Sequence, residues 1–195
     1  MGDYNAVSEA GLSLVELFRR EMTPQPIARP ETIGLCMPQE PEDFQLTVWI
    51  YLMEEYNDTG MTAGYRSDPA NLQQERYAPM QLRCHGLVTA HSKAPVQGRL
   101  PDEYRILGRA MQIIRDNPVI PPERLEGSLA ADQTGLQVTH ARMGMEELSK
   151  VWNTANRMYK PSFGIVISSF SIESNRIRSA GTRVASATID LVQKK

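Results

Sequence analysis

The sequence predicts an α/β (α+β) fold in which about three helices pack on a mixed, mostly antiparallel sheet of about five strands. Two kinds of periodicity support this prediction. Three segments place large apolar side chains with the two-residue period of a strand: 44–55, 80–90 and 162–172. Three others repeat apolar residues every three or four positions, as helices do: 4–21, 100–116 and 145–156. The thirteen prolines fall mostly between these segments, so we expect several chain reversals.

The first helix is expected over residues 4–21, because Asp3 is a suitable N-cap and an apolar stripe follows it. Arg19 and Arg20 occupy the last turn, where cations are favourable. Prolines 24, 26 and 30 then predict an extended linker, and residues 31–37 a short strand.

Residues 44–55 show the clearest alternation and carry large side chains on both faces. Leu46, Val48 and Ile50 share one face, and Trp49 and Tyr51 share the other. A strand that is apolar on both sides belongs in a sheet that is covered on both sides. Either a helix of this chain covers Trp49 and Tyr51, or another subunit does, so both residues are candidate partner-binding residues.

The central part of the chain predicts a loop, a strand and a long helix. Residues 57–75 are rich in polar residues and glycine and are expected to form a long loop. A strand over 80–90 follows, and then a helix that opens at Leu100-Pro101-Asp102-Glu103 and ends at Asn117 before Pro118. Gly108 lies inside that helix, and a close approach of another element would explain it.

The last part of the domain is predicted to contain a hairpin, a helix and a strand. Segments 125–129 and 136–142 flank Asp132-Gln133-Thr134-Gly135, which is typical of a turn between two strands. A helix over 145–156 and a strand over 162–172 follow. We therefore expect a single domain over residues 1–172.

Residues 173–195 differ in composition and are expected to form a basic C-terminal arm. The arm carries five basic residues against two acidic ones. Such a segment either frays or docks on another surface. Arg176, Arg178 and Arg183 are therefore candidate partner-binding residues, and an acidic protein surface fits them better than nucleic acid does.

Composition excludes several classes of protein. The chain has 195 residues, is 41% hydrophobic and 23% charged, and carries a formal net charge of −2, which is typical of an ordinary globular protein. It has no apolar run near the roughly 18 residues that a membrane span requires. We expect no nucleic-acid partner and no membrane partner. Cys36 and Cys84 lie in apolar runs and are expected to be reduced core residues.

The sequence offers no catalytic constellation. The three histidines, His85, His91 and His140, lack the spacing of a zinc site, and no nucleotide-binding glycine motif or nucleophile elbow occurs. Cys84 and His85 point to opposite faces of one strand, which is poor geometry for a nucleophile and its base. We expect no catalytic residue, no metal and no cofactor.

Three blocks in order resemble the cap, or tail-terminator, family of extracellular contractile injection systems. They run from Arg76-Tyr77-Ala78-Pro79 to Ala90, from Glu103-Tyr104-Arg105-Ile106 to Pro121, and from Met145-Glu146-Glu147-Leu148 to Ser162. The first helix and residues 44–57 also resemble the start of that family. One departure is Gly86, at a strand position where a larger side chain is expected.

The resemblance implies a tail-terminator-like fold and a structural protein rather than an enzyme. Members of the family form a six-fold ring on the distal end of the inner tube, end tube polymerisation and anchor the last sheath layer. The implied partners are the chain itself as a homohexamer, the inner tube protein and the sheath protein. The implied location is the cytoplasm of a bacterial cell during assembly, and then a phage-tail-like particle. A baseplate or neck adaptor and an uncharacterised soluble enzyme are the alternatives.

Overall fold

The computed structural model describes residues 2–56, 64–68, 71, 73–131, 134–154 and 159–180. The chain divides into two compact units. The larger unit contains residues 1–58 and 80–173, and the smaller unit contains residues 59–79 and 174–195. Each unit is built on its own sheet.

The larger unit contains a six-stranded sheet. Its strands, in spatial order, are β1 (Ile33–Leu35), β2 (Leu46–Glu55), β5 (Met80–Ala90), β8 (Ser162–Ile172), β7 (Leu136–His140) and β6 (Val119–Ile120). Among the described strands of this sheet, only β1 and β2 pair in parallel, and all the other neighbours are antiparallel. The expected mixed, mostly antiparallel sheet is therefore confirmed, with one strand more than the sequence predicts.

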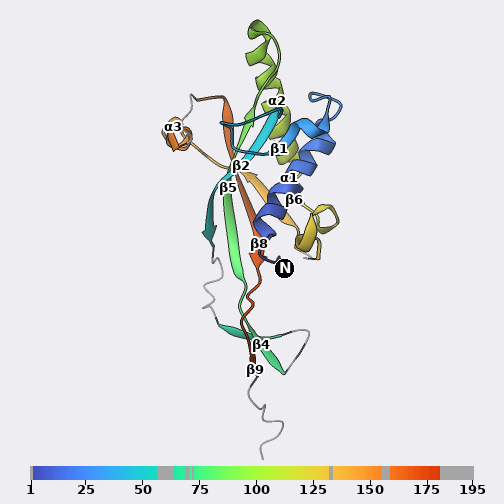
Figure 1. Cartoon of the computed structure of the whole chain (residues 1–195), viewed down its shortest axis with the longest axis vertical. Helices are drawn as coiled ribbons and strands as arrows, with labels where there is room; N and C mark the ends of the chain where they lie inside the picture. The colour runs from blue at the N-terminus through green and yellow to red at the C-terminus, as the bar shows by residue number, and fades with distance from the viewer. Residues whose placement is uncertain are drawn as a thin grey trace, which may run out of the picture. The chain divides into compact units, whose positions relative to one another are not determined.

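Within the described ranges, three α-helices accompany this sheet. They are α1 (Ala6–Met22), α2 (Val96–Asp116) and α3 (Met145–Thr154). Figure 1 shows α1 and α2 on one side of the sheet and α3 on the other. The core lies between the sheet and the first two helices, and its fully buried residues include Leu14, Phe18, Val48, Val88, Ile114 and Ile167.

The prediction of a long loop over residues 57–75 is wrong in its described part. Residues Tyr65–Ser67 form β3 and Gln74–Tyr77 form β4, and β4 also pairs with β9 (Ile177–Ser179). These three antiparallel strands make the sheet of the smaller unit. The local sequence is polar on both faces, so it lacks the apolar alternation that would reveal a strand.

The hairpin predicted between segments 125–129 and 136–142 is also wrong. Strand β7 pairs with β6 and β8, whereas residues Gly127–Ala131 form a short 3-10 helix, η3. The Glu9 carboxylate of α1 accepts hydrogen bonds from Ser128 N at 3.0 Å and from Ser128 Oγ at 2.6 Å. This carboxylate caps the short helix and holds Leu129 in the core, because it satisfies backbone donors at the helix start.

Helix α2 begins earlier than predicted. It starts at Val96 rather than at Leu100, so Pro101 lies inside it. Ser92 fixes the segment before the helix, since its Oγ accepts from Ala94 N at 3.0 Å and donates to Asp102 at 2.6 Å. The predicted end before Pro118 is confirmed. Gly108 has open space where a Cβ would lie, so no close approach within the described chain explains it.

Candidate functional site

Strand β2 leaves an unpaired edge on one side of the six-stranded sheet. Strand β1 is three residues long and pairs only with Leu46–Val48 of the ten-residue β2. Among the described residues, no strand pairs with β2 beyond Val48 on the side away from β5. A free strand edge of this kind offers backbone donors and acceptors to another chain.

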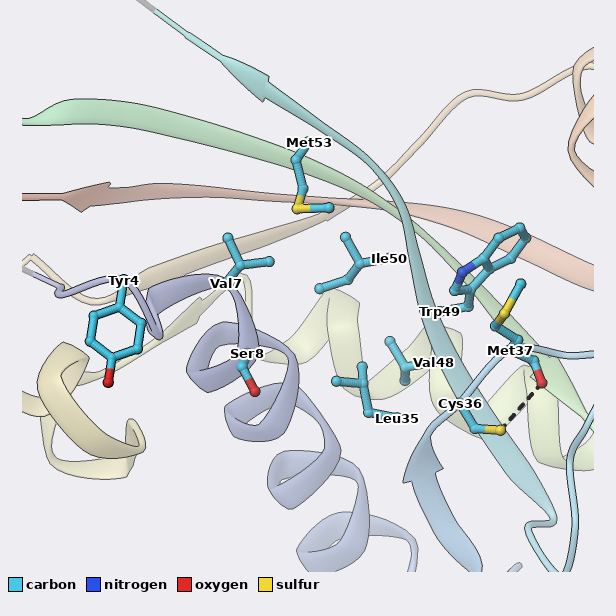
Figure 2. A pocket seen from close by; sticks show the side chains of 10 residues that line it. All are labelled: Tyr4, Val7, Ser8, Leu35, Cys36, Met37, Val48, Trp49, Ile50 and Met53. Atoms are coloured by element: carbon cyan, nitrogen blue, oxygen red, sulfur yellow. Dashed lines mark hydrogen bonds between the residues drawn. The ribbon is translucent and has the colours of Figure 1, made fainter.

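An apolar groove lies where β1 stops short. It has a volume of about 490 Å³ and is bordered by the start of α1, the end of β1 and the middle of β2. Figure 2 shows Val7, Ile50 and Met53 pointing into the space between α1 and β2. Tyr4 is 83% exposed and Met53 is 56% exposed. Large exposed apolar side chains around a groove are typical of a partner-binding surface.

Cys36 lies at one end of the groove, beside two acidic residues. Its thiol donates to Glu40 O at 2.8 Å (sulfur to oxygen) and is only partly buried. Burial raises the pKa of this thiol, and the carboxylates of Glu42 and Glu40 raise it further. The thiol is therefore protonated at neutral pH, and the surroundings of Cys36 are acidic.

Trp49 and Tyr51, the candidate residues of β2, lie next to each other. Their ring centroids are 5.8 Å apart, and the Tyr51 hydroxyl donates to Met143 Sδ at 3.7 Å. Burial raises the pKa of Tyr51, and Glu147 of α3 adds to the effect. The same chain therefore covers part of Tyr51 through the segment that precedes α3. Trp49, by contrast, borders the groove.

A one-residue bulge explains why β2 changes its faces. Ile50 pairs with Gly86 and Leu52 pairs with His85, so Tyr51 is the extra residue. Beyond the bulge, Met53 joins Ile50 on the groove side, and Leu52 is exposed. The strict alternation expected from the sequence therefore holds only before Tyr51.

Two of the three candidate arginines have partners within the smaller unit. The Arg178 guanidinium lies 2.8 Å from Glu75 Oε2 and 3.9 Å from the centre of the Tyr65 ring. Arg176 lies over the Tyr77 ring at 5.7 Å. Arg183 lies outside the described residues. The part of the arm that forms β9 thus pairs with β4 of its own chain.

Buried polar residues near the start of α2 have structural partners. The Glu103 side chain is 5% exposed, and its Oε1 accepts from Lys160 Nζ at 3.2 Å and from Ser92 N at 3.2 Å. His91 Nε2 lies 3.0 Å from Thr47 Oγ1, and burial lowers the pKa of His91 to about 4. These contacts tie the segment before α2 to the sheet and do not form a nucleophile with its base.

Features of a metal centre or of a membrane span are not found in the part of the chain that is described. There, no three His, Cys, Asp or Glu side chains are grouped to hold a metal ion. Among the described helices, none is both long enough and apolar enough to cross a membrane.

Sequence reasoning missed the groove. Its residues come from three separate segments, 4–8, 35–37 and 48–53. The only local signal for the groove is that the strand candidate at 31–37 is much shorter than the one at 44–55. The groove forms because these two strands pair in parallel, and a local sequence pattern cannot show which strands pair.

Comparison with known proteins identifies the family. The family model described as the Pvc16 N-terminal domain matches residues 11–186. The chain belongs to this family. No curated protein sequence matches the chain. Solved structures, by contrast, do match the chain and give information on its fold.

Two solved structures share the fold of this Pvc16 N-terminal domain family member. One is the sheath/tube terminator of the extracellular contractile injection system PVC in the extended state, with a TM-score of 0.68 and 12% identity over 100% of this chain and 66% of that chain. The other is the tube-terminating cap of the anti-feeding prophage, with a TM-score of 0.60 and 14% identity. That similarity covers 92% of this chain and 59% of the cap chain. The chain thus spans about two thirds of the length of the first protein and less of the second.

Proposed function

We propose that the chain is a structural cap, or tail terminator, of a contractile injection system. It binds the distal end of the inner tube as a ring, ends tube polymerisation and anchors the terminal sheath layer. The observation that carries this proposal is the similarity of the entire chain to a sheath/tube terminator, with a TM-score of 0.68, together with its membership of the family.

The described surfaces support a protein that works by binding other proteins. The unpaired edge of β2 and the apolar groove beside it are suited to contacts with another chain. The buried charged residue Glu103 is paired with Lys160 and serves the packing of α2. The proposed partners are further copies of the chain in a homohexamer, the inner tube protein and the sheath protein. Under this proposal the chain assembles in the bacterial cytoplasm and becomes part of a phage-tail-like particle.

The C-terminal arm, residues 173–195, is the proposed contact with the sheath. Strand β9 is an outer strand of the small sheet, and among the described residues only β4 pairs with it. A partner strand can therefore add to the outer side of β9. Arg178 already binds Glu75. Arg176 is exposed and contacts the Tyr77 ring, and we propose that it is the described arginine that binds a partner acid.

The cap function is tested by adding the purified chain to polymerising inner tube protein and measuring tube lengths by electron microscopy. A cap is expected to give short tubes with extra density at one end, and a heat-denatured sample serves as control. Tubes of unchanged length without end density would contradict the proposal.

The role of the arm is tested separately by deleting residues 174–195, which spares Glu173 because it belongs to the larger unit, and imaging particles from producing cells. We expect capped tubes of normal length whose last sheath layer is detached. Sheath attachment equal to that of the intact chain would show that the arm is not the contact. The larger unit holds its own core, so the truncated chain is expected to fold.

A further inference from the structure

The start of α2 projects as a helix without a covering element. Residues 95–101 are all exposed, and Figure 1 shows this end of the helix extending past the sheet. Val96 is 81% exposed, Leu100 is 46% exposed and Tyr104 is 56% exposed. These residues are four positions apart and so lie on one side of the helix. We call the segment 96–104 the α2 tip.

Such a tip is unusual in a chain that acts alone. Most helices in proteins gain their stability from packing an apolar face, and the α2 tip exposes its apolar residues to water. A row of large apolar side chains on a projecting helix is typical of a segment that inserts into a partner. The partner surface must then be apolar and concave.

The larger unit of the same chain contains a surface with these properties. The groove between α1 and β2 is lined by apolar side chains such as Leu35 and Met53, and a volume of about 490 Å³ can take several side chains. Leu35 is 37% exposed and Met53 is 56% exposed, so neither is fully covered by its own chain.

The charges of the two surfaces are complementary. Arg99 of the α2 tip is exposed and forms no ion pair in the described part of the chain. Glu40 and Glu42 are exposed beside Cys36 at the end of the groove, and within the described ranges neither forms an ion pair. An unpaired cation on one surface and two unpaired acids on the other favour their association and set its direction.

We propose that the α2 tip of one copy inserts into the α1–β2 groove of the next copy. The two surfaces differ, so the contact is head-to-tail. Repeating such a contact produces a closed ring when the rotation from one subunit to the next divides a full turn evenly. This inference rests on the proposed function, because it assigns the contact between neighbouring cap subunits. Leu100 and Tyr104 fill the groove, and Arg99 pairs with Glu40 or Glu42.

The contact is tested with the cysteine that the groove already contains. A Leu100→Cys variant, treated with a short bismaleimide, is expected to form a ladder of cross-linked chains through Cys36 of the neighbouring copy. Adding Cys36→Ser must abolish the ladder and leave at most a dimer joined through the two introduced thiols. Val119→Cys, at the exposed strand β6 on the other edge of the sheet, is the matched control and must not cross-link to Cys36. Cys36 must first be shown to react with a monofunctional maleimide, because its raised pKa leaves little thiolate at neutral pH. With Cys36 reactive, no Cys36-dependent product at any protein concentration would overturn the proposal.

A charge-reversal series provides a second, independent test. Arg99→Glu is expected to weaken self-association about tenfold, measured by sedimentation, because it removes one charge pair. Glu40→Arg and Glu42→Arg, combined with Arg99→Glu, are expected to restore it. If these combined variants do not restore self-association, the proposed pairing of Arg99 with Glu40 or Glu42 is overturned. The tube-length assay separates the two proposals, because a chain that shortens tubes but shows neither effect remains a cap with a different subunit contact.

Discussion

Two glycines, Gly86 and Gly108, have opposite surroundings. A Cβ at Gly86 would lie 3.0 Å from Ile165 Cγ1 and 3.2 Å from Trp49 O, which is tighter than ordinary van der Waals contact. The larger side chain expected at this position would require Ile165 or the backbone of β2 to shift. Gly108 has no atom within 4 Å of its Cβ position and is exposed on α2. Of these two glycines, only Gly86 lies where the packing of the chain disfavours a side chain.

Gly108→Ala is therefore expected to stabilise the chain. Glycine inside an exposed helix is about 1 kcal/mol less favourable than alanine, and the new methyl group meets no neighbour. Urea denaturation followed by circular dichroism should show an increase of about 1 kcal/mol in the free energy of unfolding. Gly86→Ala is the matched control and is expected to destabilise. An unchanged or lower stability of Gly108→Ala would contradict the view that Gly108 has open space in an exposed helix.

We expect His91 to make the stability of the larger unit depend on pH. Burial, assisted by Lys160, lowers its pKa to about 4 from a usual 6.5, while Thr47 lies 3.0 Å from the ring. Between pH 6.5 and 4 the unfolded chain binds a proton that the folded chain does not, so stability falls as the pH falls through this window. The loss approaches about 3 kcal/mol by a pH of about 4.

The measurement compares the free energy of unfolding at several pH values for the intact chain and for His91→Gln. Asp102 and Glu103 accept hydrogen bonds from Ser92, the residue next to His91, and both are unchanged in the two proteins. The slope between pH 6.5 and 4 is expected to be smaller for His91→Gln. Equal slopes in the two proteins would show that His91 is not the responsible group.

At the scale of elements, the position of α2 depends on a buried ion pair. The Glu103 side chain is 5% exposed and its carboxylate accepts from Lys160 Nζ at 3.2 Å, which links α2 to the segment that precedes β8. Lys160→Ala leaves a buried carboxylate with one remaining donor, Ser92 N. We expect a loss of about 2 kcal/mol, reduced from the value for a fully buried pair because Lys160 is 39% exposed.

The matched control for Lys160→Ala is Lys150→Ala on α3. The Lys150–Glu146 pair is exposed on both sides, and such pairs contribute about 0.5 kcal/mol or less. Thermal unfolding of both variants provides the comparison. A similar small change in the two variants would argue against a structural role for the Glu103–Lys160 pair.

At the scale of the whole molecule, the two units differ in how much they bury. The larger unit has a continuous apolar core, whereas Asp68 is the single buried residue among those described in the smaller unit. The small sheet is held by surface contacts such as Arg178 with Glu75 and Tyr65 with Tyr77. Contacts of this kind remain open to water and stabilise weakly.

Hydrogen exchange is therefore expected to be fast in β4 and β9 and slow in β5 and β8. The difference should be about tenfold or more, since local opening of the small sheet exposes little apolar surface. Arg178→Ala should raise the exchange of β4 further without changing that of β5. Equal protection of the two sheets would contradict the unequal burial.

The elements of the larger unit could largely be predicted from local patterns. The apolar stripes of α1 and α3 and the alternation in β5 and β8 depend on residues close in sequence. The candidate site could not be predicted in the same way. Trp49 was found because it is large and apolar, but the groove it borders and the bulge at Tyr51 depend on the pairing of β2 with β1 and β5.

The sequence by itself determined which segments are helices and which are long strands, because periodicity and prolines act over a few residues. The predicted N-cap Asp3 is wrong, since α1 begins at Ala6 after Asn5 and no side chain caps it. Only the tertiary structure decided the capping of η3 by Glu9, the pairing of β9 with β4, and the hollow beside β2 where β1 stops. Each of these joins residues that are distant in the chain. Their contacts depend on strand register and on the lengths of neighbouring elements, and neither quantity is encoded in a local pattern.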